Sequence, residues 1–174
     1  SLQSYIETME DHRTSGLLEL TISKQGMPKL CSYETLAGEL TSEGSFLVGK
    51  CLKGVITAKS EDLPHMLIAG STGAGKSNFF KRTLIGLLES TPNLQMYLID
   101  LKQGVEMAPF EGIPNVRVIS DLGSSLKILN MLIKVMERRY TSLKMSKRNN
   151  FDPQLDNEPR IVVGIDEASV LYQI

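Results

Sequence analysis

The residues best suited to chemistry in this sequence form one glycine-rich stretch, Gly70–Ser77, which reads G-x-x-x-x-G-K-S. A polyphosphate carries dense negative charge, and it binds well where consecutive backbone N–H groups point into one concavity. Glycine permits the tight turns that such a concavity requires, and glycine stands at the first, fourth and sixth positions of the stretch. The pattern therefore predicts a phosphate-binding loop.

The other residues of this loop fit the same chemistry. Lys76 would reach the β- and γ-phosphates of ATP, and the Ser77 hydroxyl would bind Mg²⁺. A helix that begins near Lys76 would add its free N-terminal amides and the positive end of its dipole. We therefore expect the nucleotide to be bound by Gly70, Ser71, Thr72, Gly73, Ala74, Gly75, Lys76, Ser77 and Asn78.

A second stretch, Ile161–Glu167, is an apolar run that ends in two acids, I-V-V-G-I-D-E. Many strands end in acids, so the run alone is a weak signal, but downstream of the glycine loop it has the form of a Walker B motif. Asp166 would hold Mg²⁺ through water, beside the Ser77 oxygen. Glu167 would polarise the attacking water. A second acid after the first predicts hydrolysis of ATP and not only its binding.

Hydrophobic patterning predicts the elements that position these groups. Met66–Ala69 predicts a short strand before the loop, and an apolar residue at i, i+4, i+7 and i+8 from Phe80 predicts a helix after it. Three further buried strands are expected at Gln95–Ile99, Val116–Ile119 and Ile161–Ile165. Asp100 ends the first of these strands, where it would serve either as a ligand group at the sheet edge or as a polar cap.

One long helix is expected from Ser120-Asp121, which can cap it, to about Met145. Its charged segment Glu137–Arg139 would be a solvated face or a subunit contact. The helix carries an apolar stripe that we interpret as core packing, formed by Leu126, Leu129, Leu132, Ile133, Met136, Tyr140 and Leu143.

The N-terminal third carries no chemical motif. We expect a short helix and a Ser-Gly break in residues 1–16, a hairpin over Gly16–Tyr33 with a turn at Lys24–Gly26, and a short helix over Glu34–Gly44. A second hairpin is expected from Phe46 to Ala58.

Composition is consistent with one globular core, because the chain has 174 residues, of which 41% are hydrophobic and 22% are charged. The net charge of −1 gives no overall basic character that would indicate nucleic acid, although a basic pore in an assembly remains compatible with it. Cys31 and Cys51 are far apart and indicate free thiols of a reducing compartment, so we expect a cytoplasmic location. A membrane anchor of the full-length protein, outside this chain, stays open. No apolar run approaches membrane-spanning length, and His12 and His65 form no metal-binding cluster.

Several motifs, in the same order, resemble the motor domain of the FtsK/SpoIIIE DNA translocases. The resemblance begins near Val48–Lys50, and M-E-R-R-Y matches the family as it stands. The other segments that carry it are P-H-M-L-I-A-G-S-T-G-A-G-K-S at 64–77, L-I-D-L-K at 98–102, F-E-G-I-P at 110–114 and I-V-V-G-I-D-E at 161–167. Asn115 stands where the family usually has His, the linker after M-E-R-R-Y is shorter, and residues 1–45 have no clear counterpart.

The resemblance implies an α/β fold: a RecA-like P-loop core with a parallel sheet, truncated after the Walker B strand and preceded by short β-hairpins. Residues 1–45 would be an N-terminal hairpin and linker segment, and 46–174 the ATPase domain. Further strands, an arginine that reaches a neighbour's ATP and DNA-facing loops are expected beyond Ile174.

The function that the resemblance implies is ATP hydrolysis coupled to movement of double-stranded DNA through a ring, a hexamer. Lys76 would neutralise phosphate charge, Ser77 and Asp166 would hold Mg²⁺, and Glu167 would be the general base. Two alternatives remain open. One is a secretion or conjugation coupling ATPase that moves protein or nucleoprotein, and the other is a nucleotide-binding module without turnover.

Overall fold

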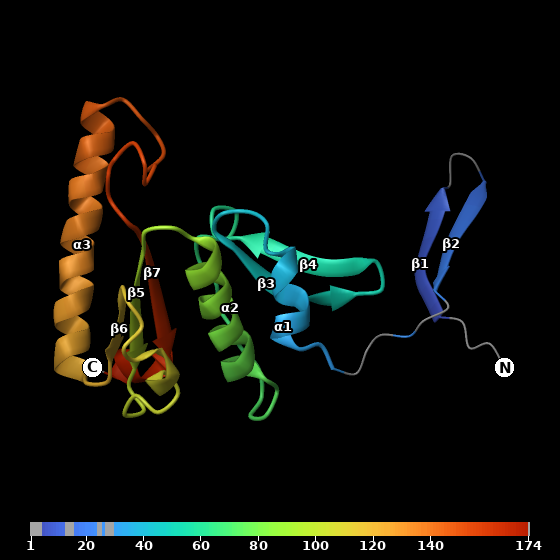
Figure 1. The fold of residues 1–174 in the computed structure, drawn as a ribbon, viewed down its shortest axis with the longest axis horizontal. Helices are drawn as coiled ribbons and strands as arrows, with labels where there is room; N and C mark the ends of the chain where they lie inside the picture. The colour runs from blue at the N-terminus through green and yellow to red at the C-terminus, as the bar shows by residue number, and fades with distance from the viewer. Residues whose placement is uncertain (1–4, 13–15, 24–25, 27–29, 174) are drawn as a thin grey trace. The chain divides into compact units, whose positions relative to one another are not determined.

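The computed structural model describes residues 5–12, 16–23, 26 and 30–173 of the chain (Figure 1). The chain divides into two compact units, Ser1–Ser90 and Thr91–Ile174. The elements in chain order are β1 (Tyr5–His12), β2 (Leu17–Ser23), α1 (Tyr33–Leu36), η1 (Ala37–Glu39), β3 (Ser45–Cys51), β4 (Gly54–Lys59), α2 (Lys76–Ser90), β5 (Leu94–Asp100), η2 (Ala108–Phe110), β6 (Val116–Ile119), α3 (Leu122–Met145), β7 (Arg160–Asp166) and η3 (Ala168–Gln173).

The first unit begins with an antiparallel hairpin in which β1 pairs with β2, from Tyr5 opposite Ser23 to His12 opposite Leu17 (Figure 1, blue). The helix that we expected in residues 1–16 is therefore wrong over Tyr5–His12. Lys24 and Gln25 of the expected turn lie outside the described residues, and residues 30–32 form no strand. Whether a segment forms a strand depends on its pairing partner more than on its own composition. The polar sequence of β1 does not indicate that β2 is its partner.

The second expected hairpin is confirmed, because β3 and β4 pair antiparallel with Phe46 opposite Ala58. The helix expected at Glu34–Gly44 appears in shorter form, as α1 followed by η1. Helix α2 lies against β3, and the side chains of Phe46, Leu84 and Leu87 are buried. At the end of the helix the Ser90 hydroxyl donates to the carbonyl of Ser45 at 2.7 Å.

Gly86 permits the close approach of α2 to β3. A Cβ atom added at this glycine would lie 3.1 Å from both Cα and Cβ of Phe46. We expect Gly86→Val to lower the free energy of unfolding by about 1–3 kcal/mol, because the backbone of a paired strand must move to admit the side chain. Urea unfolding of this chain measures the effect. Gly38→Val is the matched control in the same unit, since a Cβ at Gly38 meets nothing within 4 Å; equal losses in the two variants would contradict the packing explanation.

The second unit contains a parallel sheet with the strand order β6-β5-β7 (Figure 1). Strand β6 and the end of α3 fall where the sequence predicts them, and Asp121 caps α3 by accepting a bond from the Ser124 amide at 2.8 Å. The core lies between the sheet and this helix. It contains Ile99, Ile119 and Ile128, with Tyr97, Leu101, Leu129, Leu132 and Ile165 packed against them.

The apolar stripe of α3 is only partly core, which corrects the sequence prediction. Leu129 and Leu132 pack against the core, whereas Leu126, Ile133, Met136 and Tyr140 are 42–63% exposed. The apolar stripe is wider than the part of the α3 surface that packs on the three-stranded sheet. The residues at the edge of the stripe therefore remain exposed to solvent.

Within M-E-R-R-Y, Arg139 forms a tie, by which we mean a set of bonds to other residues of the same chain. We expected a solvated face or a subunit contact for this segment, and neither includes such bonds. Its Nε donates to Glu158 at 2.9 Å, its Nη2 donates to the carbonyl of Pro159 at 2.8 Å, and its guanidinium stacks over the Phe151 ring at 4.1 Å. Arg138 also reaches Glu158, at 2.9 Å. These contacts fasten the segment that returns from α3 to β7.

No helix in the described part of the chain is long and apolar enough to cross a membrane.

Candidate functional site

The glycine loop lies in the first unit, where a turn over Thr72–Gly75 leads directly into α2 at Lys76. Gly73 and Gly75 have φ angles of 79° and 90°, a backbone conformation that favours glycine over residues with a side chain. The amide of Ala74 bonds to the carbonyl of Ser71 at 3.2 Å and closes the turn. Gly70, Ser71, Thr72 and Asn78 are exposed.

The amides of this turn are available to a ligand. Phe79 N–H donates to the carbonyl of Gly75 at 2.9 Å, so the helical bonds begin there. Among the described residues, the amides of Gly73, Gly75, Lys76 and Ser77 have no intramolecular acceptor. Free amides at a helix N-terminus, together with the helix dipole, favour a bound phosphate.

Lys76 already extends over the loop. Its ammonium donates to the carbonyl of Ser71 at 2.9 Å, and the side chain is half-buried. The neutral carbonyl holds the ammonium beside the turn without neutralising its charge. A phosphate oxygen at this place would be a stronger acceptor, because a charge-assisted hydrogen bond is roughly twice as strong as a neutral one.

The strand that we expected before the loop is not formed. Met66–Ala69 has no regular secondary structure, and Leu67 is 89% exposed. A strand needs a ladder partner, and in this unit β3 and β4 pair with each other. The apolar run thus predicts burial but does not determine which neighbour would supply the hydrogen bonds.

The second unit carries the acids, at the carboxyl edge of its parallel sheet. The register of β5 and β7 sets Asp100 opposite Asp166. Asp100 is fully buried, and its two oxygens accept the amides of Lys102, Glu106 and Met107 at 2.9–3.1 Å. Of the two roles considered for Asp100, the structure therefore supports the cap, because its carboxylate organises the loop that follows β5.

Asp166 is half-buried among other acids. Burial raises the pKa of this carboxyl above its ordinary value, and the neighbouring Asp100 carboxylate raises it further, while Lys102 acts in the opposite direction. Excess negative charge of this kind fits a divalent cation. Among the described residues no group of three or more His, Cys, Asp or Glu side chains is arranged to hold a metal ion.

Glu167 follows β7 directly, with a φ angle of 54° that is uncommon for a residue with a side chain. Its Oε1 lies 2.5 Å from the ammonium of Lys102, and its Oε2 accepts from the Ser169 hydroxyl at 3.5 Å. The hydrogen bond to Glu167 raises the pKa of Lys102 above its ordinary value. Sequence reasoning assigned no role to Lys102. The available signal was that it follows the strand next to β7 and so emerges at the same sheet edge.

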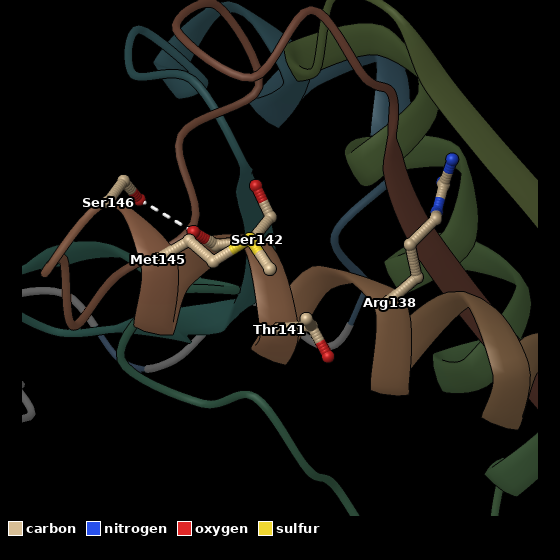
Figure 2. Close-up of a pocket in the computed structure, with 5 residues that line it drawn as sticks. All are labelled: Arg138, Thr141, Ser142, Met145 and Ser146. Carbon is tan, nitrogen blue, oxygen red and sulfur yellow. Dashed lines mark hydrogen bonds between the residues drawn. The ribbon is translucent and has the colours of Figure 1, made fainter.

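Two hollows of the second unit contain none of the predicted site residues. One is an open depression of about 680 Å³ along the last turns of α3, lined by Arg138, Thr141, Ser142, Met145 and Ser146 (Figure 2). The other is an apolar groove of about 280 Å³ between α3 and β7, whose lining includes Met136, Tyr140 and Val163. The first hollow is lined mostly by polar side chains and the second mostly by apolar ones.

Comparison with known proteins gives a consistent picture. Residues 41–173 match the model of the FtsK/SpoIIIE family. DNA translocase FtsK of Mycobacterium leprae is 40% identical over 110 residues, which are 60% of this chain and 13% of the relative. DNA translocase FtsK of Lactiplantibacillus plantarum is 36% identical over 146 residues, which are 73% of this chain and 18% of the relative. The chain thus spans less than a fifth of these relatives.

Two solved structures are similar in fold. The pCW3 conjugation coupling protein TcpA, in a monomer form with ATPγS, has a TM-score of 0.72 and 26% identity, covering 97% of this chain and 48% of that one. The cytoplasmic domain of EssC has a TM-score of 0.62 and 21% identity, covering 86% of this chain and 30% of that one.

Proposed function

Because this chain belongs to the FtsK/SpoIIIE family, we propose that it is part of an ATP-hydrolysing motor that moves double-stranded DNA. The observation that carries the proposal is the glycine loop that turns into α2 with free amides, in a chain whose relatives are named DNA translocases. The ATPγS in the TcpA structure supports ATP as the nucleotide. The fold, an α/β chain with a parallel sheet, is that of a P-loop ATPase core.

The residues divide the work as follows. The loop amides from Gly70 to Asn78 bind the phosphates, and Lys76 neutralises the charge that develops on the transferred group. Ser77 and Asp166 would hold Mg²⁺, which would supply further charge neutralisation. Glu167 accepts a proton from the attacking water. The loop residues Gly70–Asn78 belong to the first unit of the chain, and Asp166 and Glu167 belong to the second.

The motor acts as a ring, a hexamer, in the cytoplasm. The free thiols of Cys31 and Cys51 support a reducing compartment. With a net charge of −1, this chain has little non-specific attraction for phosphate backbones. Contacts to DNA therefore come from a local surface or from other parts of the protein.

The proposed function predicts that linear duplex DNA stimulates the ATPase of the full-length protein. Stimulation requires phosphate contacts, so the DNA concentration for half-maximal stimulation should rise steeply between about 50 and 200 mM salt. Phosphate release, measured with and without duplex at both salt concentrations, provides the test. An ATPase that is indifferent to duplex at both concentrations would exclude a DNA motor, and the absence of any turnover would favour a nucleotide-binding module.

The likeness to TcpA favours a second candidate, conjugation coupling, in which the cargo is a nucleoprotein. The two candidates differ in what naked DNA achieves. A translocase displaces a third strand from naked duplex during ATP hydrolysis. If the cargo is a nucleoprotein, the ATPase should require duplex or single strand that carries a bound protein, and displacement from naked duplex would argue against this candidate.

A further inference from the structure

Lys102 lies at the same sheet edge as Glu167 and contacts it. Parallel pairing with Asp100 opposite Asp166 makes the segments after β5 and β7 emerge side by side. Lys102 is two residues past Asp100, Glu167 is one residue past Asp166, and Nζ and Oε1 are 2.5 Å apart. The proposed mechanism uses Glu167 but gives Lys102 no task.

Both ends of this pair have a defined backbone. The Lys102 amide donates to the fully buried Asp100 carboxylate at 3.0 Å, and that carboxylate also binds the amides of Glu106 and Met107. On the other side, Glu167 has a left-handed φ, and its carbonyl accepts the amide of Val170 at 3.0 Å. The Lys102 ammonium therefore reaches Glu167 from a loop whose backbone is held in place by hydrogen bonds.

This arrangement is unfavourable for a general base. A carboxylate takes a proton from water with an oxygen lone pair that faces the water. Here the Lys102 ammonium occupies Oε1, and the Ser169 hydroxyl lies 3.5 Å from Oε2. Each carboxylate oxygen therefore already lies beside a donor of the chain, which an attacking water would have to displace.

We propose that Lys102 is a positioning residue that holds Glu167 in a resting arrangement, and that ATP cleavage requires the Lys102–Glu167 pair to open. This inference rests on the proposed function, because it takes Glu167 as the base. The two side chains are 56% and 39% exposed, so the pair opens easily. Removing a pair this exposed changes the open fraction by about two- to fivefold.

The test is steady-state ATPase of the full-length protein without DNA. Lys102→Gln is expected to raise kcat by about two- to fivefold and to leave KM for ATP within about twofold, because the lysine acts on the base and not on the nucleotide. Lys102→Arg keeps the charge and should remain close to wild type. Lys134→Gln is the matched control, an exposed lysine on α3 in the same unit, and it should change nothing.

A double variant shows whether the lysine acts through Glu167. Glu167→Gln and the combination Lys102→Gln/Glu167→Gln should have the same residual turnover. If Lys102→Gln raises turnover by the same factor in the Glu167→Gln background, the lysine acts elsewhere and the inference is wrong. An unchanged or lowered kcat in Lys102→Gln alone also overturns it.

These outcomes separate this inference from the proposed function. If Glu167→Gln is inactive and Lys102→Gln behaves as wild type, Glu167 is the base and only the resting role of Lys102 is lost. If Glu167→Gln turns over ATP as wild type does, the assignment of the base fails, and the role of Lys102 fails with it.

Discussion

Lys76→Ala is expected to reduce ATP turnover by about a hundredfold to a thousandfold, as the removal of one preorganised donor to developing charge does elsewhere. The loop places Lys76 beside its free amides, and the Lys76 ammonium donates a hydrogen bond to the carbonyl of Ser71. Without it, the amides alone would face a polyphosphate that carries several negative charges. Phosphate release and ATP binding, measured by calorimetry, check the two parts of this expectation.

The fold should survive this change. The bond to the Ser71 carbonyl is exposed, so its loss costs about 1 kcal/mol or less of unfolding free energy. Lys53→Ala, in the turn between β3 and β4, is a matched control: it removes an exposed lysine of the same unit and should leave turnover unchanged. Normal ATP affinity and turnover in Lys76→Ala would mean that the loop is not the nucleotide site.

Glu167→Gln is expected to leave ATP bound and to slow its cleavage by about a hundredfold or more, the usual loss when a general base is removed. The amide has nearly the shape of the carboxylate but does not accept a proton from water. Binding should persist because the proposed function assigns the phosphates to the glycine loop and not to Glu167. Single-turnover hydrolysis of radiolabelled ATP, with ATP binding measured in parallel, separates these two effects.

Glu111→Gln provides the control for this variant, because Glu111 is an exposed acid of the same unit outside the sheet edge. It should hydrolyse ATP at the wild-type rate. Turnover in Glu167→Gln equal to that control would remove Glu167 from the mechanism.

The sequence predicted those elements whose signals are local. The span of α3 follows from the Asp121 cap and the helical period, and the structure contains both the cap and the helix. The span of β6 follows from a short apolar run after Pro114 and Asn115, where the φ of Asn115 is 65° and turns the chain. Likewise, the glycines of the loop predicted a turn, and Gly73 and Gly75 have the positive φ angles that a turn of this kind uses.

The misses concern partners, which a local pattern does not specify. Tyr5–His12 is a strand because β2 lies opposite it. Met66–Ala69 is not a strand, since no described residue of its unit pairs with it. Apolar periodicity predicted which side of α3 is hydrophobic, but the width of the sheet decides how much of that side is buried. The contact of Lys102 with Glu167 depends on a register between two strands: the sequence indicates that both residues follow strands, but not that these strands are neighbours.

The tie made by Arg139 has a consequence for how fast the second unit folds. Strand β7 pairs with β5 at Arg160 opposite Leu94, and these residues are 160 − 94 = 66 positions apart in the sequence. Pairing between such distant residues costs the conformational entropy of closing a long loop. The bond from Arg139 to Glu158 spans 158 − 139 = 19 residues. Because each halving of a loop saves about 0.6 kcal/mol of closure entropy, taking these 19 residues out of a loop of 66 saves about 0.3 kcal/mol. We therefore expect the arginine to lower the barrier to folding slightly, in addition to fastening the finished structure.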